Sequence, residues 1–408
     1  MRRLVCALSI ALLVAAFASL LSAQGPSPRR FAVVIPDSSL ERVEDIGLRA
    51  HTNHLIRFDP ESSGTAPSGE TPQSIWPVYN LPATGGAGVI VIVDAFHYPM
   101  ALNDFNVFSS QFGLPVEPST DPLLSSNQVF QVVYASGTQP PVPRRTSTKC
   151  EWAHEAALDI EWAHAMAPSA KIVLVEAASN LLSDLLQAVD VANTIPGAAA
   201  VSMSWGGSEF SSESLNDFHF TQRGIVYFAA SGNTGGATIY PSTSPNVVAA
   251  GGTTIHRDTS GNFTGETGWS SSGGGPSLYE PRPSYQDVIS SIVGNARGVP
   301  DYSFNADPNS GVSIYVSTVC HRMSGWLVFG GTSVAAPSLA GIVNLAGHFS
   351  ASSNDELTLI YSSVSNGGAT INSTYFRDIT SGTAGSFSAV PGWDFVTGVG
   401  SNQGLNGK

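Results

Sequence analysis

The sequence predicts an α/β fold in which a largely parallel central sheet carries helices on both faces. Short apolar runs alternate with longer segments of helical periodicity over most of the chain. Strands buried on both faces appear as continuous apolar runs, and helical connections between such strands imply right-handed crossovers and a parallel sheet. Of the 408 residues, 42% are hydrophobic, 12% are charged and 41 are glycine, which indicates a large globular core with many loops.

The predicted strands and helices follow one another in regular order after residue 80. The expected buried strands are 88–93, 171–175, 199–203, 225–230 and 247–250. The expected helices between them are 152–167, 181–192 and 213–223. Sites in parallel sheets form beyond the carboxyl ends of the strands, so we expect Asp94, Trp205 and Asn233, at or just after three of these ends, to lie near one site.

The N-terminal residues 1–23 have the pattern of a secretory signal peptide. Arg2 and Arg3 precede an apolar stretch that ends in the small residues Ser22 and Ala23. A membrane anchor is the alternative, but the apolar stretch is at the short limit for a span. We therefore expect an exported protein, extracellular or periplasmic, with no membrane association once the signal is removed.

The rest of the chain divides into two parts. Residues 24–73 are polar and rich in proline, without strong periodicity, and are interpreted as a short leader or pro-segment; residues 74–408 form the main domain. The formal net charge of −13 disfavours nucleic acid and anionic membrane surfaces as partners. Two cysteines remain after the signal, Cys150 and Cys320, and they form either one disulfide or two separate buried thiols.

The segment from Trp326 to Leu345 predicts a strand, a tight turn and a buried helix. Two glycines at the turn permit backbone angles that other residues avoid, so Ser333 can place its hydroxyl over the helix N-terminus. Negative charge that develops on that oxygen is favoured there. Pro337 is expected in the first helical turn. The alternative is that Gly-Thr-Ser is simply a helix cap.

A second chemical cluster lies in the predicted helix that follows Cys150. Glu151, Glu155 and Asp159 recur four residues apart, so their carboxylates can lie along one helix face. Partial burial would raise at least one pKa, and a carboxyl pair that shares a proton can act as general base and then as general acid. A solvated acidic face is the alternative, although the other residues of this helix are mostly small and apolar.

Five motifs in order carry a resemblance to a known family. They are Val91-Ile92-Val93-Asp94-Ala95, the Glu155 to Asp159 helix with the following 167–172, Ser202-Met203-Ser204-Trp205-Gly206, 297–301, and Gly331-Thr332-Ser333 with Pro337. With these motifs the chain resembles the sedolisins, serine-carboxyl peptidases of subtilisin-like fold, over nearly all of the main domain.

The resemblance implies a role for each matching residue. Ser333 would be the nucleophile, Glu155 its general base and acid, and Asp159 the group that orients Glu155. Asp94 and Trp205 would extend the hydrogen-bonded network behind them. Asn233 departs from the family, which generally carries Asp there as the oxyanion donor. The family also has a long folded pro-domain, whereas this chain has only some dozens of residues before the core.

The resemblance also implies one structural calcium ion near the C-terminus. Its ligands would be the carboxylates and carbonyls of Asp378, Ile379, Val390, Gly392 and Asp394. Hard oxygen ligands suit calcium, and two carboxylates offset its charge. The alternative is a pair of turns with capping Asp residues.

Three functions follow as hypotheses. The first is a secreted serine-carboxyl endopeptidase that acts on protein or peptide substrates. The second is a subtilisin-type peptidase that uses Asp94, His154 and Ser333, although His154 lacks the Gly-Thr-His context and points about 100° away from Glu155. The third is a non-catalytic exported binding protein on the same fold, because a fold alone does not determine activity.

Overall fold

The computed structural model describes residues 31–58, 64–145 and 147–408. The predicted signal peptide, residues 1–23, lies outside these ranges. The α-helices are α1 Pro72–Ile75, α2 Ala101–Phe112, α3 Thr148–Met166, α4 Leu182–Ala192, α5 Ser290–Val293, α6 Thr332–Ala346 and α7 Ser353–Tyr361. The strands of the central sheet are β4 Val89–Ala95, β5 Phe130–Tyr134, β6 Lys171–Ala177, β7 Ala198–Met203, β9 Val226–Ala230, β11 Val248–Arg257, β12 Phe263–Gly268, β15 Tyr302–Asn305, β20 Phe376–Arg377 and β23 Ser401–Asn402.

Smaller antiparallel sheets surround the central one. A four-stranded sheet consists of β1 Ala32–Val34, β3 Leu55–Phe58, β16 Val312–Cys320 and β17 Met323–Gly330. A three-stranded sheet consists of β2 His51–Thr52, β8 Trp205–Ser208 and β10 Ile239–Tyr240. Three hairpins complete the set: β13 Gly275–Pro281 with β14 Ala296–Val299, β18 Val364–Ser365 with β19 Thr370–Ile371, and β21 Thr383–Ala384 with β22 Phe387–Ser388.

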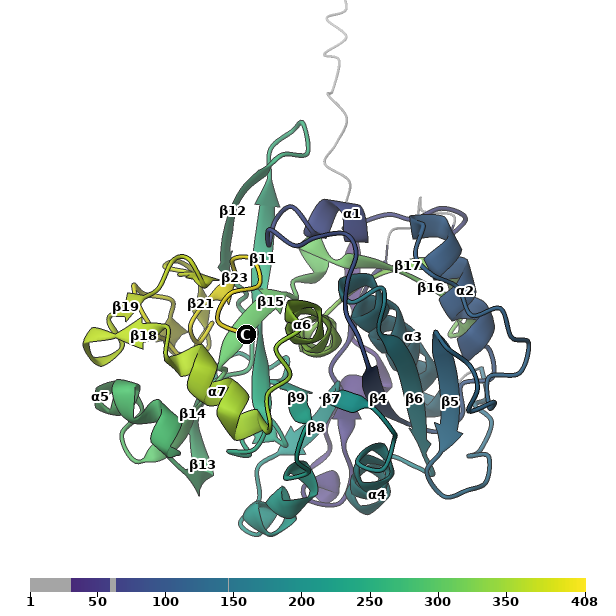
Figure 1. Cartoon of the computed structure of the whole chain (residues 1–408), viewed down its shortest axis with the longest axis horizontal. Coiled ribbons are helices and arrows are strands. Elements are labelled where there is room, and N and C mark those ends of the chain that lie inside the picture. The colour runs from purple at the N-terminus through teal and green to yellow at the C-terminus, as the bar shows by residue number, and fades with distance from the viewer. Residues whose placement is uncertain (1–30, 59–63, 146) are drawn as a thin grey trace, which may run out of the picture.

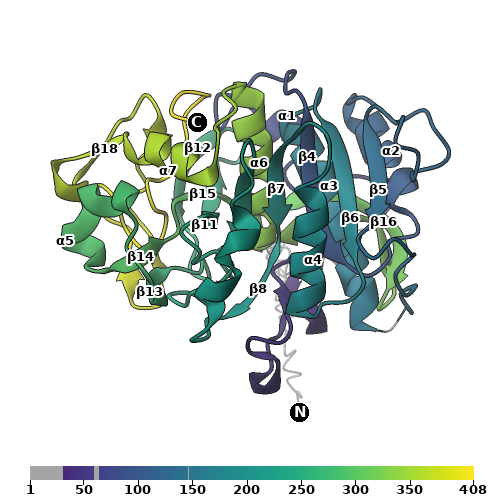
Figure 2. The same cartoon turned by 60° about the horizontal axis from the view of Figure 1, so that its bottom comes forward.

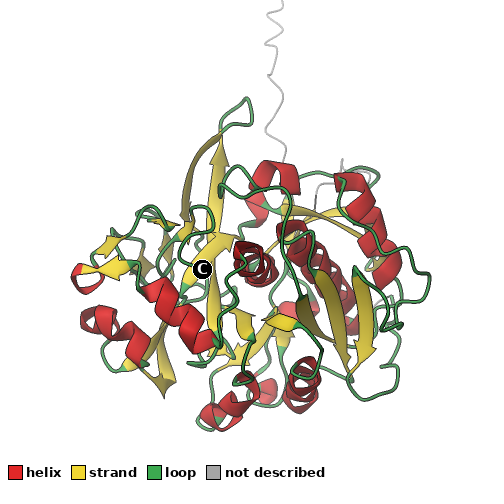
Figure 3. Ribbon diagram, viewed as in Figure 1, coloured by secondary structure: helices red, strands yellow, loops and turns green. Residues whose placement is uncertain are grey.

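The central sheet crosses the middle of the molecule, with helices on both of its faces (Figures 1 and 3). Its strand order is β20-β23-β15-β11-β9-β7-β4-β6-β5, with β12 paired to β11. Neighbours from β5 to β23 are parallel, while β12 and β20 are antiparallel to their partners. The predicted fold class, a largely parallel sheet with helices on both faces, is confirmed.

Both faces of the sheet are buried, as continuous apolar strands require. In β4, Ile90 and Ile92 belong to the core cluster that includes α3 and α6, whereas Val91 and Val93 belong to the cluster that includes α4. Figure 2 shows α4 on the face opposite to α3 and α6. Within the described ranges, no helix has both the length and the apolar character that crossing a membrane requires.

The predicted elements agree with the structure except in one place. The expected strands correspond to β4, β6, β7, β9 and β11, and the expected helices 152–167 and 181–192 to α3 and α4. The expected helix 213–223 is instead a 3₁₀ helix over Glu213–Phe220. Ser, Asn, Asp and aromatic residues dominate that segment, and their low helix propensity explains the difference.

The leader is part of the folded body, which its sequence did not indicate. Strand β3 lies between β1 and β17, and β2 extends the sheet of β8 and β10. Strands of two to four residues are too short to show a period, and they are ordered by partners far away in the sequence. The leader therefore lies against the strand that leads to Ser333.

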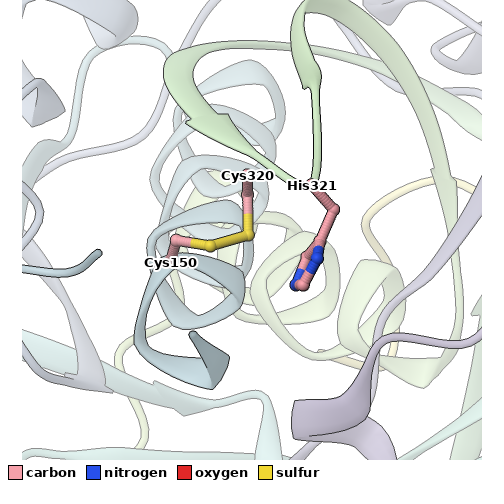
Figure 4. Close-up of side chains that lie close together, drawn as sticks. All are labelled: Cys150, Cys320 and His321. Carbon is pink, nitrogen blue, oxygen red and sulfur yellow. A yellow bond between two sulfur atoms is a disulfide. The ribbon is translucent and has the colours of Figure 1, made fainter. Parts of the chain in front are cut away.

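The two cysteines form a disulfide that ties the start of α3 to the end of β16 (Figure 4). Their Cα atoms are 5.5 Å apart. His321 lies beside the bond, and its Nε2 is 3.1 Å from Oε1 of Glu151. Although His321 and the two sulfurs could together meet the distances for a metal site, the sulfurs are bonded to each other and cannot act as thiolate ligands.

A fully buried ion pair joins Arg297 and Asp301 beside strands β11 and β15. The guanidinium of Arg297 donates to both carboxylate oxygens of Asp301 at 2.8 and 2.6 Å, and both side chains are fully buried. Asp301 also accepts from the N–H of Ala249 and the hydroxyl of Tyr361. Both terminal nitrogens of the guanidinium and both oxygens of the carboxylate are therefore hydrogen-bonded, whereas Nε of Arg297 has no partner among the described residues.

Asp301→Asn is expected to lower the free energy of unfolding by about 3–5 kcal/mol, because it leaves a buried guanidinium without its counter-charge. Urea unfolding followed by circular dichroism measures this change. The matched control is Asp287→Asn, which breaks an ion pair with Arg282 in which the Asp side chain is 65% exposed. The control should cost less than about 1 kcal/mol. Equal losses in the two variants would contradict the prediction.

Candidate active site

Ser333 is the second residue of α6 and follows directly on strand β17, as the strand, turn and helix prediction requires. Gly331, at the turn, has φ of 100°, and a Cβ there would overlap the carbonyl of Asn53. Pro337 is not in the first turn but is the sixth residue of α6. Its missing N–H leaves the carbonyl of Ser333 without a helical donor, and Oγ of Ser204 lies 3.3 Å from that carbonyl oxygen.

Three carboxyl groups are buried beside this turn. Helix α3 presents Glu155 and Asp159, and the end of β4 presents Asp94; none is more than 1% exposed. The hydroxyl of Ser204 donates to Oδ1 of Asp159 at 2.8 Å. Burial, reinforced by the charges of Asp94 and Glu155, raises the pKa of Asp159 well above its usual range. Burial and the charges of Glu155 and Glu176 do the same to the pKa of Asp94. Neither carboxyl oxygen of Asp94 has a hydrogen-bond partner among the described residues, so the predicted hydrogen-bonded link through Asp94 is not formed. The alternative that the acidic residues of this helix form a solvated face is therefore excluded.

The side-chain amide of Asn233 is oriented by the start of α6. Its Oδ1 accepts from the N–H of Thr332 at 2.9 Å and from that residue's hydroxyl at 3.1 Å. The amide nitrogen therefore faces the other way and donates to the carbonyl oxygen of Asn53 at 2.7 Å. The backbone N–H of Ser333 donates to the same oxygen at 3.3 Å. Two donors thus converge on one peptide carbonyl beside the candidate nucleophile.

His54 is the residue that sequence reasoning missed. Its Nδ1 lies 2.7 Å from Oε2 of Glu155, and both side chains are fully buried. Its ring stacks on Phe329 with centroids 5.1 Å apart. No spacing in the sequence connects a leader histidine with α3, so the only signal was the presence of a histidine in the leader. Ser333 Oγ donates at 3.3 Å to the carbonyl of Ser204, and not to Glu155.

Two predicted site residues point elsewhere. The indole N–H of Trp205 donates to the carbonyl of Val93 at 2.8 Å, and its ring lies in the core on the α4 face, so the predicted link from Trp205 to the carboxyl network is not formed. Nε2 of His154 lies 3.1 Å from the carbonyl oxygen of Thr318, and burial lowers the pKa of His154 to about 3. Successive residues of a helix point about 100° apart, so α3 cannot direct both His154 and Glu155 to Ser333.

The residues predicted to bind calcium surround one turn near the C-terminus. Oδ2 of Asp378 accepts from the N–H of Gly392 at 2.9 Å, and Oδ2 of Asp394 accepts from the N–H of Val390 at 3.0 Å. The other oxygen of Asp394 accepts from two further N–H groups. Oδ1 of Asp378 is buried and has no partner among the described residues. Burial raises the pKa of Asp394 to about 6 and raises that of Asp378 as well.

Comparison with known proteins identifies the family to which the chain belongs. A model of the subtilase family matches residues 150–400, more than half of the chain. The chain therefore belongs to the subtilase family. Its fold matches a solved structure described as Pseudomonas sedolisin, a serine-carboxyl proteinase, complexed with two molecules of pseudo-iodotyrostatin. The TM-score is 0.64 at 24% identity, over 83% of this chain and 96% of that one.

The curated relatives that match the chain include sedolisin itself, which confirms the predicted resemblance. Kumamolisin of Bacillus sp. (strain MN-32) is 29% identical over 385 residues, which are 85% of this chain and 64% of kumamolisin. Sedolisin of Pseudomonas sp. (strain 101) is 34% identical over 177 residues, which are 40% of this chain and 28% of sedolisin. The chain thus spans less than two thirds of the length of these relatives.

Asn233→Asp is expected to move the alkaline limb of the activity profile to lower pH. A carboxyl group donates a hydrogen bond only while protonated, so activity is lost as the pH rises through the pKa of the new side chain, whereas an amide donates at every working pH. Initial rates of hydrolysis of an unfolded protein, measured against pH for both chains, provide the comparison. Alkaline limbs that superimpose would mean that residue 233 does not serve an oxyanion.

Proposed function

We propose that this chain is an exported serine-carboxyl endopeptidase that hydrolyses peptide bonds in protein or peptide substrates. The observation that carries the proposal is the peptide carbonyl of Asn53, which accepts from Nδ2 of Asn233 and from the N–H of Ser333. This is the arrangement that stabilises an oxyanion during acyl transfer. Export rests on the signal-like residues 1–23.

Ser333 is the proposed nucleophile, because its hydroxyl lies at the N-terminus of α6 beside these two donors. Glu155 is the proposed base that takes the hydroxyl proton and later gives it to the leaving amine. It must first exchange its present partner, His54, for Ser333. A single group that serves both steps needs to be ionised before attack and protonated afterwards.

On this proposal Asp159 orients Glu155, and Asp94 lies behind the pair. Burial and neighbouring charge raise the pKa values of Asp159 and Asp94, which favours the neutral form of both carboxyl groups. Oε1 of Glu155 and Oδ2 of Asp159 are both buried without another partner among the described residues. A protonated Asp159 can therefore orient Glu155 by donating to it.

Glu155→Gln is expected to reduce turnover by roughly 10²–10⁴-fold, the usual worth of a general acid–base group. Asp159→Asn should also reduce it, and the double variant should lose far less than the product of the two losses because the residues act as one unit. Rates of hydrolysis of unfolded protein measure this, with circular dichroism to show that the fold is kept.

His154→Ala is the matched control on the same helix and should leave turnover nearly unchanged. Loss of activity in His154→Ala but not in Glu155→Gln would favour the subtilisin-type arrangement. Absence of hydrolysis by the wild-type chain would favour the non-catalytic binding protein.

We further propose that the C-terminal turn holds one calcium ion through Asp378 and Asp394, with the carbonyls of Ile379, Val390 and Gly392 as the other ligands. The buried, unpartnered Oδ1 of Asp378 fits this role best, and a cation would offset two carboxylates whose pKa values burial raises. Asp394 fits less fully, because both of its oxygens already accept backbone N–H groups. An ion at this turn would stabilise the native state.

Calcium is expected to raise the melting temperature and a chelator to lower it, by mass action on the native state. Asp378→Asn and Asp394→Asn should each remove most of the difference between the two melting curves. Asp258→Asn is the matched control, because that Asp also accepts backbone N–H groups of a turn but is exposed and lies in another loop. A melting temperature that responds to neither calcium nor chelator would contradict the proposal.

A further inference from the structure

A fourth buried acidic residue, Glu176, lies next to the carboxyl groups of the candidate active site. It stands at the carboxyl end of β6, and its Cα pairs in register with that of Asp94 on the neighbouring parallel strand β4. Ile92 and Leu174, two residues earlier on these strands, belong to the core cluster that includes α3, so Asp94 and Glu176 point to that same face. Both acidic residues are 1% exposed. The two side chains are therefore buried neighbours on one face of the sheet.

The two carboxyl groups differ in their hydrogen bonds. Oε1 of Glu176 accepts from the N–H of Tyr98 at 2.9 Å, and Oε2 of Glu176 lies 2.8 Å from Nδ1 of His97. A protonated histidine carries a hydrogen on that nitrogen and donates it to the carboxylate. Asp94, by contrast, has no partner on either oxygen among the described residues. The arrangement therefore suits a carboxylate at Glu176 and a neutral carboxyl group at Asp94.

His97 is the one basic residue that forms an ion pair with Glu176 in the part of the chain that the structure describes. Its side chain is 13% exposed, and its ring packs edge-on against Tyr134 of β5, which pairs in register with Glu176. Burial and the charges of Glu176 and Asp121 raise the pKa of Tyr134, so this phenol is neutral in acid. Lys149 of α3 lies over a phenylalanine ring instead. The net charge of the pair therefore depends on His97, and a histidine is cationic in acid solution.

The charge of Glu176 reaches the proposed base through Asp94. Burial, and then the charges of Glu155 and Glu176, raise the pKa of Asp94. Burial, and then the charges of Asp94 and Glu155, raise the pKa of Asp159. Glu155 and Asp159 lie about one turn apart on α3. Four acidic side chains thus influence one another in a series that begins at the partly exposed His97 and ends beside Ser333.

From this geometry we propose that His97 and Glu176 form a positioning pair that sets the pH range in which the carboxyl groups of the candidate active site work. The inference rests on the proposed function. The pair acts through Asp94 and not on the substrate. A carboxylate at Glu176 opposes a second negative charge on the adjacent strand, and a protonated His97 partly cancels that effect. In acid the imidazolium therefore allows Glu155 to be ionised at a lower pH than it would be beside an uncompensated Glu176.

The test is the dependence of kcat/KM on pH, measured with the full chain and a fluorescently labelled unfolded protein as substrate. The acid limb of this profile reports the ionisation of the essential base. Glu176→Gln removes a negative charge, so the carboxyl groups ionise more readily and the acid limb should move to lower pH by roughly one unit. His97→Gln removes the compensating positive charge, so the acid limb should move to higher pH.

Two further variants separate the effect of charge from that of structure. The double variant of His97→Gln with Glu176→Gln carries neither charge and should reverse most of the upward shift of His97→Gln. His97→Lys keeps a positive charge and should leave the acid limb close to that of wild type.

The matched control is His219→Gln. Nδ1 of His219 lies 2.7 Å from Oδ1 of Asp190, and the His219 side chain is also 13% exposed. Asp190 belongs to α4, however, on the face of the sheet opposite to α3 (Figure 2). This variant should leave the acid limb where it is.

Opposite shifts in the two single variants support the proposal. Shifts in the same direction, or a lower kcat with an unmoved acid limb, overturn it and leave the pair a structural role. If circular dichroism shows that Glu176→Gln does not fold, the contrast between His97→Gln and His97→Lys decides, and equal limbs in these two overturn the proposal. A wild-type chain that hydrolyses protein while the variants keep its acid limb overturns this inference alone. A wild-type chain that hydrolyses nothing overturns the proposed function and this inference with it.

Discussion

The burial of three carboxyl groups in one small apolar space is the constraint on which this structure depends. Asp94, Glu155 and Asp159 lie between the central sheet and α3, where an unpaired charge is costly. Two of the groups respond with raised pKa values, and the third is paired with His54. The fold thus favours the neutral form of two of the three carboxyl groups and places the third beside an imidazole.

Close packing of two helices makes this burial possible. Helix α3 is rich in alanine, and α6 meets it at Gly341, where a Cβ would overlap Met166. Such close contact between helices needs small side chains. Pro337 frees the carbonyl of Ser333, and the hydroxyl of Ser204 contacts both this carbonyl and Asp159. The packing that buries the carboxyl groups therefore also sets their position relative to Ser333.

The leader completes the site in the way that a bound peptide would. Its strand β2 pairs with the edge strand β8, and the carbonyl of Asn53 accepts hydrogen bonds from two N–H donors. The imidazole of His54 is hydrogen-bonded to the carboxyl group of Glu155. Outside the strand, Glu151 of α3 accepts from the N–H of Ser38 at 2.7 Å. Of the three acidic residues in register on α3, the first thus anchors the leader and the other two lie at the candidate nucleophile.

Local pattern in the sequence was enough to predict the central sheet, its main helices, the strand–turn–helix around Ser333 and the carboxyl pair on α3. These features follow from periodicity, glycine and spacing along one helix, which are properties of neighbouring residues. The sequence could not predict that the indole of Trp205 donates to the carbonyl of Val93, that Cys150 and Cys320 are bonded, or that His54 contacts Glu155. Those outcomes depend on contacts between segments far apart in the chain, and only the packing of the whole chain brings such segments together.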